Sequence, residues 1–142
     1  VHIEFKIIND KIFIIEVNPR TIGGLCSRSL NFNLFRNSLE TVILSDLVND
    51  KQVSLNLASN STGVLMLSIP EEGIFKGIKN IEKAKKLKEI VNIEISLPID
   101  THINKPPFSE RYLGFVFANG ESNAETKNAL LECEDLLEPI IE

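Results

Sequence analysis

The sequence has few cysteines, no excess of positive charge and no long apolar run. Its 142 residues include two cysteines, Cys26 and Cys133, which are far apart and lack metal-site spacing. This usage is typical of a reducing compartment, so we expect a cytoplasmic protein. Twenty Asp and Glu against fifteen Lys and Arg give a net charge of −5. Nucleic acid is therefore not an expected partner, because no broad positive field is available to bind its phosphates.

The apolar runs are also too short for a membrane protein. None approaches the roughly 18 to 20 residues that a membrane helix needs, and no charged-then-apolar leader opens the chain. The 43% hydrophobic content is sufficient for a soluble globular core. Because Val1 already lies inside an alternating pattern, we expect the chain to be a fragment whose upstream part has been removed or left out.

Residues 1–20 alternate between apolar and polar in two runs, which predicts a β-hairpin. The apolar face is expected to contain Ile3, Phe5 and Ile7 from the first strand and Phe13, Ile15 and Val17 from the second. A three-residue loop at 9–11 would pair Ile8 with Ile12 and therefore Glu4 with Glu16. A two-residue loop would place the two glutamates on opposite faces, so we predict an odd-length loop.

The remaining pattern divides the chain into two units. Residues 1–50 continue from the hairpin through a short helix after Gly23-Gly24, with Leu25, Leu30 and Leu34 as candidate buried positions, to a second helix that ends at Val48. Ser38 is the candidate cap of that second helix, which we expect to pack behind the hairpin. Residues 51–62 are polar and form the expected connection.

Residues 63–142 predict a small α+β lobe. The expected elements are an apolar run at 64–69, a short segment at 74–78, a helix at 81–89, strands at 91–97 and 112–118, and a last helix. A proline-rich loop, 99–110, separates the two strands. Ser122 and Glu125 have the spacing of a capping box at the start of the last helix.

The candidate site is Glu4 with Glu16, Asn18 and Arg20. Glu16, Asn18 and Arg20 occur at every second position and would project from one face of the hairpin. Two opposed carboxylates repel unless a cation lies between them, and oxygen ligands of this kind suit Mg²⁺. Arg20 could then face phosphate, and the Gly23 and Gly24 amides at a helix start could hold an anion. From spacing alone, the ordinary alternative is a solvated hairpin face.

A family resemblance adds to this pattern. Glu4, followed by Glu-Val-Asn-Pro-Arg at 16–20 and Gly23-Gly24, resembles the closing hairpin of the ATP-grasp superfamily. The resemblance implies that Glu4, Glu16 and Asn18 bind Mg²⁺ or Mn²⁺. It also implies that Arg20 is catalytic and contacts the transferring phosphate or the substrate carboxylate. The family's phosphate loop and ATP-binding lysines lie upstream of this motif, so the chain alone is expected to be inactive.

Later segments resemble the carboxy-terminal lobe of L-amino-acid ligase-type proteins in this superfamily. They are Gly-Val-Leu-Met-Leu-Ser-Ile-Pro at 63–70, Gly-Ile-Phe-Lys-Gly-Ile at 73–78 and Arg-Tyr-Leu-Gly-Phe-Val-Phe-Ala-Asn-Gly-Glu-Ser at 111–122. The expected parent is a carboxylate–amine ligase that uses ATP and magnesium and proceeds through an acyl phosphate. Its partners would be ATP, a small carboxylate and an amine, amino acids among them. A homodimer is also a candidate.

Two alternatives stay open. One is another ATP-grasp enzyme, related to carbamoyl-phosphate synthetase, biotin carboxylase or the purine-pathway ligases. The other is a non-catalytic α+β module for dimerisation or regulation, in which the polar hairpin face is only solvated surface.

Overall fold

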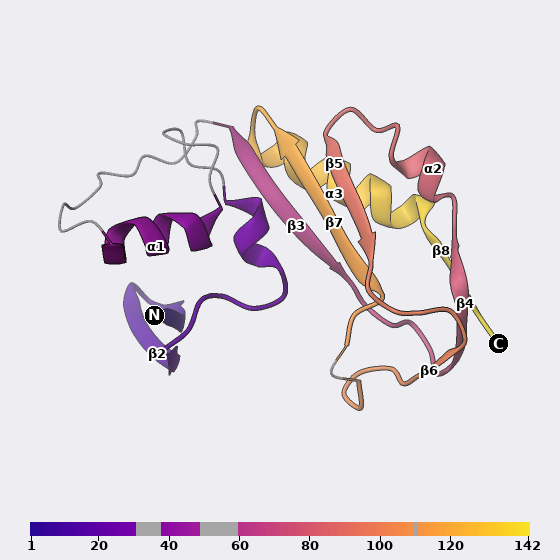
Figure 1. Ribbon diagram of the computed structural model, residues 1–142, viewed down its shortest axis with the longest axis horizontal. Helices are drawn as coiled ribbons and strands as arrows, with labels where there is room; N and C mark the ends of the chain where they lie inside the picture. Colours follow the sequence, from indigo (N-terminus) through magenta and orange to yellow (C-terminus); the bar gives the residue numbers. More distant parts are fainter. Residues whose placement is uncertain (31–37, 49–59, 110) are drawn as a thin grey trace.

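The protein has a hairpin-containing N-terminal part and a larger C-terminal lobe (Figure 1). The structure is a computed structural model that describes residues 1–30, 38–48, 60–109 and 111–142. The N-terminal part contains strands β1 (His2–Ile8) and β2 (Lys11–Asn18), the short 3-10 helix η1 (Cys26–Ser29) and helix α1 (Leu39–Val48). Most of the predicted connection, 51–59, and the candidate buried position Leu34 lie outside the described residues.

The loop of the hairpin has two residues, so the predicted odd-length loop is wrong. Ile8 pairs with Lys11, and the two residues between them, Asn9 and Asp10, have φ values of 49° and 60°. Asn and Asp tolerate this left-handed conformation, and two such residues match the twist of antiparallel strands. Asn9 and Asp10 therefore form the whole loop, and Lys11 is already part of the second strand.

A β-bulge further along the hairpin restores the predicted pairing of the glutamates. Phe5 pairs with Ile14, but the next pair is Glu4 with Glu16, so Ile15 is an extra residue without a partner. A bulge of this kind leaves two residues of one strand opposite one residue of the other. Glu4 and Glu16 consequently lie on one face, because directly opposed residues of an antiparallel pair share a face.

The bulge also changes the apolar face of the second strand. Phe13 pairs with Lys6 and not with an apolar residue, whereas Ile12 pairs with Ile7. The prediction that Phe13 and Ile15 continue the face of Phe5 is therefore wrong, because it assumed uninterrupted alternation. The apolar residues that share a face are Ile3, Phe5, Ile7, Ile12, Ile14 and Val17.

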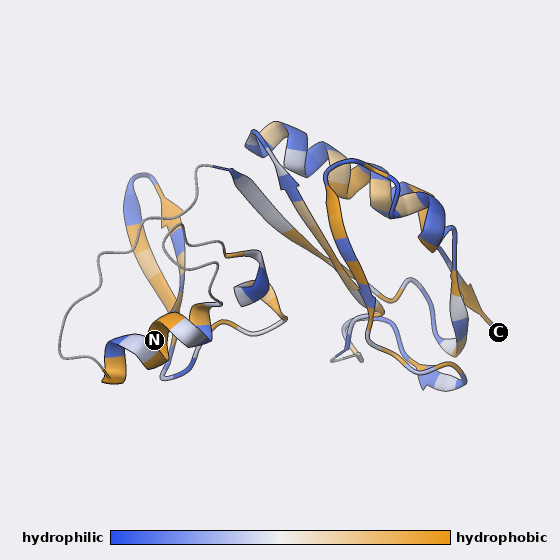
Figure 2. Cartoon of the chain, turned by 45° about the horizontal axis from the view of Figure 1, so that its top comes forward, coloured by the Kyte–Doolittle hydropathy of each residue, from blue (hydrophilic) through white to orange (hydrophobic). Residues whose placement is uncertain are grey.

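Both strands of the hairpin are rich in apolar residues (Figure 2), and apolar side chains are exposed on both of its faces. Phe5 is 53% exposed on one face and Phe13 is 50% exposed on the other. Helix α1 begins as predicted, with the Ser38 hydroxyl accepting the Thr41 amide at 3.3 Å, but none of its side chains is buried. The core expected between α1 and the hairpin is thus not formed in the described part of the chain.

The C-terminal lobe contains two three-stranded antiparallel sheets. The first has the order β3 (Ser61–Leu67), β7 (Gly114–Gly120), β5 (Ile90–Ile95). The second has the order β6 (Thr101–Ile103), β4 (Gly73–Lys79), β8 (Glu138–Ile141). Helix α3 (Asn123–Leu136) lies along one face of the first sheet, near the short helix α2 (Ile81–Ala84) (Figure 1).

The core lies between the sheets and α3. It includes Phe75 from β4, Val116 from β7 and Cys133 from α3, each at most 1% exposed. The predicted capping box is formed, since the Ser122 hydroxyl accepts the Glu125 amide at 3.2 Å. The Glu125 carboxylate in turn accepts the amide of Glu121 at 2.9 Å, one residue before the expected Ser122 amide.

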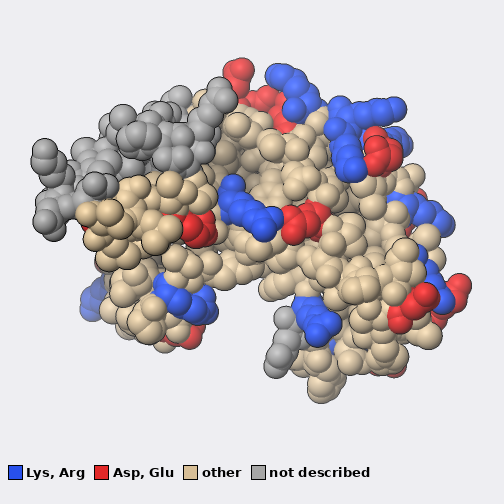
Figure 3. Space-filling view, in the orientation of Figure 1, with Lys and Arg blue, Asp and Glu red and all other residues tan. Residues whose placement is uncertain are grey.

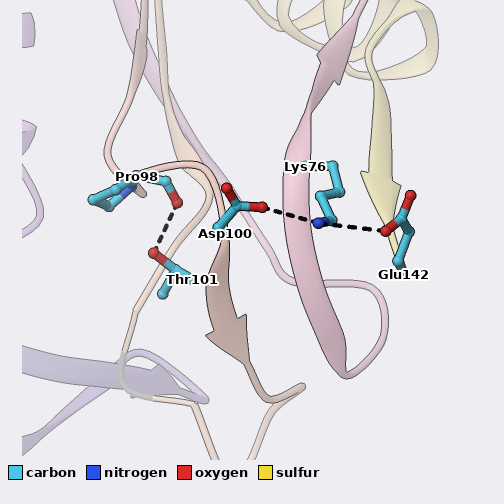
Figure 4. A network of polar contacts seen from close by, with 5 residues as sticks. All are labelled: Lys76, Pro98, Asp100, Thr101 and Glu142. Carbon is cyan, nitrogen blue, oxygen red and sulfur yellow. Dashed lines mark hydrogen bonds and ion pairs between the residues drawn. The ribbon is translucent and has the colours of Figure 1, made fainter.

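An ion-pair network ties the second sheet to the end of the chain (Figure 4). The Lys76 ammonium on β4 lies 2.9 Å from an oxygen of Asp100 and 3.4 Å from an oxygen of Glu142. Hydrogen bonds to these two carboxylates raise the pKa of Lys76 above its usual value. The network joins three segments that the second sheet brings together, β4 and the residues flanking β6 and β8.

No helix in the described ranges has the length and apolar character to cross a membrane.

Candidate functional site

The candidate site occupies the open end of the hairpin, where β1 begins and β2 ends. Glu4 lies opposite Glu16, and His2 lies opposite Asn18. Register and alternation therefore place these four side chains on one face. The structure brings the three predicted metal ligands together, and it adds His2 as a fourth polar neighbour.

Two polar atoms of this face are buried without a partner. The side-chain nitrogen of Asn18 and Nδ1 of His2 make no hydrogen bond within the described residues. The other imidazole nitrogen of His2 lies 3.7 Å from a carboxylate oxygen of Glu4. Buried polar atoms are nearly always paired, with protein or with ordered water, so these two atoms are candidates for contact with water or a bound group. Another part of a longer protein could also supply such a partner.

The donor set fits magnesium better than a transition metal. Within the residues that the structure describes, no group of three or more His, Cys, Asp or Glu side chains could hold a metal ion. Glu4, Glu16 and Asn18 instead offer two carboxylates and one amide oxygen. Mg²⁺ is commonly held by only one or two carboxylates, with phosphate oxygens and water completing its octahedral shell.

Arg20 lies beyond the strand that positions the other residues. Strand β2 ends at Asn18, and the Arg20 guanidinium donates a hydrogen bond to the Thr21 carbonyl at 2.9 Å. Strand alternation therefore does not place Arg20 as predicted. Its guanidinium instead approaches Gly23, where a Cβ would lie 3.5 Å from Nη1. The structure brings Arg20 and Gly23 together, and within the described ranges no hydrogen bond or ion pair joins Arg20 to the glutamates.

The glycine segment is tightly packed but does not open a full helix. Gly24 has a φ of 62°, and a Cβ there would lie 3.1 Å from the sulfur of Met66. The predicted short helix follows as η1, a 3-10 helix of four residues, and the anion site expected at Gly23 and Gly24 stays a prediction. Any anion binding at these glycines would depend on their individual backbone amides.

Polar contacts attach this segment to the rest of the protein. The guanidinium of Arg28 lies 2.6 Å from a carboxylate oxygen of Glu94 on β5. The Ser27 hydroxyl donates to the Glu40 carboxylate of α1 at 3.1 Å. Backbone and serine hydrogen bonds hold the pKa of Glu40 below its usual value. Segment 23–28 is therefore bonded both to α1 and to the first sheet of the lobe.

A cavity of about 380 Å³ lies where the two parts of the protein meet. The N-terminal part contributes Gly24, and the lobe contributes Ser96, Leu97, Arg111, Tyr112 and Phe115. None of the lobe residues was predicted as a site residue. Arg111 opens the Arg-Tyr-Leu-Gly-Phe segment, which resembles the carboxy-terminal lobe of L-amino-acid ligase-type proteins. The sequence shows the positive charge of Arg111, but no local pattern places it beside Gly24.

Comparisons with known proteins agree with this architecture. The family model described as L-amino acid ligase C-terminal domain 2 matches residues 65–142. No curated protein matches the chain. A crystal structure of L-amino acid ligase from Bacillus licheniformis matches with a TM-score of 0.80 and 19% sequence identity, over 99% of this chain and 36% of that one.

A crystal structure of phosphoribosylglycinamide synthetase from Anaerococcus prevotii also matches. Its TM-score is 0.69 and its sequence identity 18%, over 99% of this chain and 36% of that one. At such identities the likeness shows the fold alone. It confirms the predicted α+β fold of the carboxy-terminal part of an ATP-grasp ligase, and the chain spans about a third of the length of these two relatives.

Proposed function

Because the chain belongs to the L-amino acid ligase C-terminal domain 2 family, we propose that it is part of a carboxylate–amine ligase that uses ATP and Mg²⁺. The observation that supports this most is the pairing of Glu4 with Glu16, beside Asn18. Like charges placed directly opposite are unfavourable in a sheet, so a cation between them would remove the conflict. The reaction would take place in the cytoplasm, in keeping with the cysteine usage.

Glu4, Glu16 and Asn18 are the residues that would hold the metal. When bound there, Mg²⁺ or Mn²⁺ supplies charge neutralisation and orientation for the phosphates of ATP. The two carboxylates carry most of the attraction, and the Asn18 amide oxygen adds a neutral ligand. The unpaired side-chain nitrogen of Asn18 is a hydrogen-bond donor, so a phosphate or water oxygen of the loaded site, and not the metal itself, would be its partner.

Arg20 is the proposed catalytic residue. An oxygen of the substrate carboxylate attacks the γ-phosphorus of ATP, the bond to ADP breaks, and an acyl phosphate forms. The amine then attacks the acyl carbon, phosphate leaves and a proton is released. The Arg20 guanidinium would stabilise the negative charge on the transferring phosphate or hold the substrate carboxylate. Its position against Gly23 supports a shared anion site that includes the Gly23 and Gly24 amides.

The chain would supply only one side of this active site. We assign residues 1–50 to the end of the catalytic domain, 51–62 to a connection and 63–142 to a separate small lobe. The exposed apolar faces of the hairpin support the first assignment, because a hairpin within a larger sheet would be covered. On this proposal the chain alone does not turn over ATP, and the exposed hairpin would favour association with a second copy.

The direct test is a screen of the full-length parent protein. ADP release would be measured with Mg²⁺ and pairs of L-amino acids, together with mass spectrometry of the ligation product. We expect ADP and product to form in equal amounts for at least one pair, and to be lost in Arg20→Ala. Catalysis that persists in Arg20→Ala would contradict the role of Arg20. No ADP release with any pair would favour the non-catalytic alternative.

The likeness to phosphoribosylglycinamide synthetase keeps a second candidate, another ATP-grasp ligase with a different carboxylate or amine. This candidate predicts ATP turnover that depends on the same residues but not on an amino acid pair. Offering bicarbonate, formate and phosphorylated amines in the same assay separates the two proposals.

A further inference from the structure

We propose that Arg111 binds the carboxylate of an amino acid whose amine is the acceptor in the ligation. This inference rests on the proposed function and adds the residue and the cavity that would hold the acceptor amino acid. The proposed site is the cavity between Gly24 and the lobe, which we call the junction cavity. Its lining combines one guanidinium with aromatic and aliphatic side chains.

The junction cavity shares a glycine segment with the proposed anion site beside Arg20. Gly24 lines it, and the preceding residue, Gly23, lies against the guanidinium of Arg20. A group in the cavity would thus contact Gly24, whose amide belongs to the proposed anion site. Figure 3 shows a hollow between the N-terminal part and the lobe, with Lys or Arg side chains on both sides of its opening. Positive charge on both sides suits substrates that carry carboxylate and phosphate.

Arg111 is an available cation. Among the described residues, no carboxylate lies within ion-pair distance of its guanidinium. The main chain of Arg111 bonds to Ser109, whose hydroxyl accepts the Arg111 amide at 3.1 Å and donates to its carbonyl at 3.2 Å. A planar guanidinium can bind both oxygens of a carboxylate.

The other walls suit the body of an amino acid. The rings of Tyr112 and Phe115 lie 5.9 Å apart at 59°, and Leu97 adds an aliphatic surface. At about 380 Å³ the junction cavity falls within the usual range for small ligands, roughly 300 to 1,000 Å³. A site with apolar walls and one convergent cation favours an amphipathic acid over a phosphorylated sugar, which would need several polar partners.

The chemistry assigns this carboxylate to the acceptor and not to the activated substrate. The activated carboxylate must meet the γ-phosphate, and the proposed place for that is beside Arg20 and the metal ligands. An acceptor amino acid brings its own carboxylate, in addition to the activated carboxylate of the donor, and this group takes no part in the reaction. Arg111 would neutralise that charge and direct the amine towards the acyl carbon.

The experiment uses the full-length parent and two forms of the acceptor. The donor carboxylate and MgATP are kept saturating, and KM is measured for each of a panel of L-amino acids and for the matching α-amides. The variants are Arg111→Gln, Arg111→Lys and, as a control that removes a charge from the same loop, Lys105→Gln. Lys105 is exposed and does not line the junction cavity. Circular dichroism checks that all variants fold.

We expect Arg111→Gln to raise KM for the amino acid acceptor by ~10-fold or more, since a charge-assisted bidentate contact is lost. Arg111→Lys should have an intermediate effect, because it keeps the positive charge but loses the planar pair of donors that binds both carboxylate oxygens. KM for the amide acceptor and for ATP should not change. Lys105→Gln should match the wild type throughout.

The failure of this inference can be distinguished from the failure of the proposed function. If ligation occurs and depends on Arg20 but Arg111→Gln leaves the amino acid KM unchanged, the inference is overturned and the function stands. If the wild type shows no ligation, calorimetric titration with the same amino acids tests whether the carboxylate site at Arg111 exists. Binding that is lost in Arg111→Gln supports the carboxylate site without the ligase, and no binding to the wild type overturns both.

Discussion

Glu4 lies directly opposite Glu16 across the hairpin, although the two-residue loop alone would place these glutamates on different faces. The extra residue Ile15 changes the register by one between Phe5 and Glu4. A bulge disrupts the hydrogen bonds between the strands, and an opposed pair of carboxylates adds an unfavourable repulsion. Such features often occur beside active sites, where they aim particular side chains. The pairing is therefore the structural basis of the proposed metal site.

The first prediction concerns the stability of the metal-free protein. Glu16→Gln should stabilise the hairpin without Mg²⁺ by a few tenths to about 1 kcal/mol, because it removes a cross-strand repulsion. Hydrogen exchange of the β1 and β2 amides in the parent protein, with and without metal, measures the effect. Glu132→Gln, at an exposed position of α3, is the matched control. Faster exchange of the hairpin in metal-free Glu16→Gln would show that the glutamates do not repel.

The second prediction compares two neighbouring glycines. Gly24→Ala should destabilise the segment by roughly 1 to 2 kcal/mol, because alanine is disfavoured at positive φ, and its Cβ would lie 3.1 Å from the Met66 sulfur. Gly23→Ala should be tolerated, since its Cβ would meet only Arg20 at an ordinary 3.5 Å. Urea unfolding of both variants checks the difference. Equal stabilities would contradict the described conformation of Gly24.

The third prediction concerns the thiols. Burial raises the pKa of Cys133 to about 11, whereas Cys26 is only half-buried. At pH 8 a maleimide should therefore label Cys26 in the folded protein and label both thiols after unfolding. Mass spectrometry of peptides identifies the labelled residue. Rapid labelling of native Cys133 would contradict the packing of α3 against the sheets.

The same shift has a consequence for stability. The neutral thiol of Cys133 is favoured in the folded state, since its pKa lies above the unfolded value of 9.0. Its contribution to stability is fully present below that value and is lost as pH rises towards about 11. Cys133→Ala should remove this part of the pH dependence, and Cys26→Ala should leave it unchanged. Thermal unfolding between pH 8 and 11 provides the comparison.

Local patterns predicted much of the fold. Alternation placed both strands of the hairpin, and the Ser38 and Ser122 caps marked the starts of α1 and α3. The loop length was wrong because Asn9 and Asp10 form a complete turn by themselves. The bulge at Ile15 has no local signature, since it exists only in the pairing of two strands.

Elements that depend on distant partners were missed. Strand β6 has three residues within the proline-rich loop and forms through its pairing with β4. Strand β8 contains Pro139, which a local reading excludes but the edge of a sheet tolerates. Helix α2 ends at Ala84 and not at 89, because the chain turns tightly there and the Leu87 amide bonds to the Ala84 carbonyl.

The candidate site could be predicted only in part for the same reason. The motif identified Glu4, Glu16, Asn18 and Arg20, but alternation could not place Arg20, because β2 ends two residues earlier. Arg111 could not be predicted, since the junction cavity exists only when the lobe folds against Gly24. Residues that come together only through tertiary contacts have no characteristic separation in the sequence.

The most direct test of the central claim is the Mg²⁺ dependence of ATP turnover by the full-length parent. Initial rates would be measured against free Mg²⁺ for the wild type, Glu4→Gln, Glu16→Gln and the control Glu132→Gln. We predict that each hairpin variant needs ~10-fold or more Mg²⁺ for half-maximal rate, or loses turnover, because one charged ligand is removed. The control should match the wild type. Unchanged Mg²⁺ dependence in Glu4→Gln and Glu16→Gln would contradict the assignment of the metal site to this hairpin.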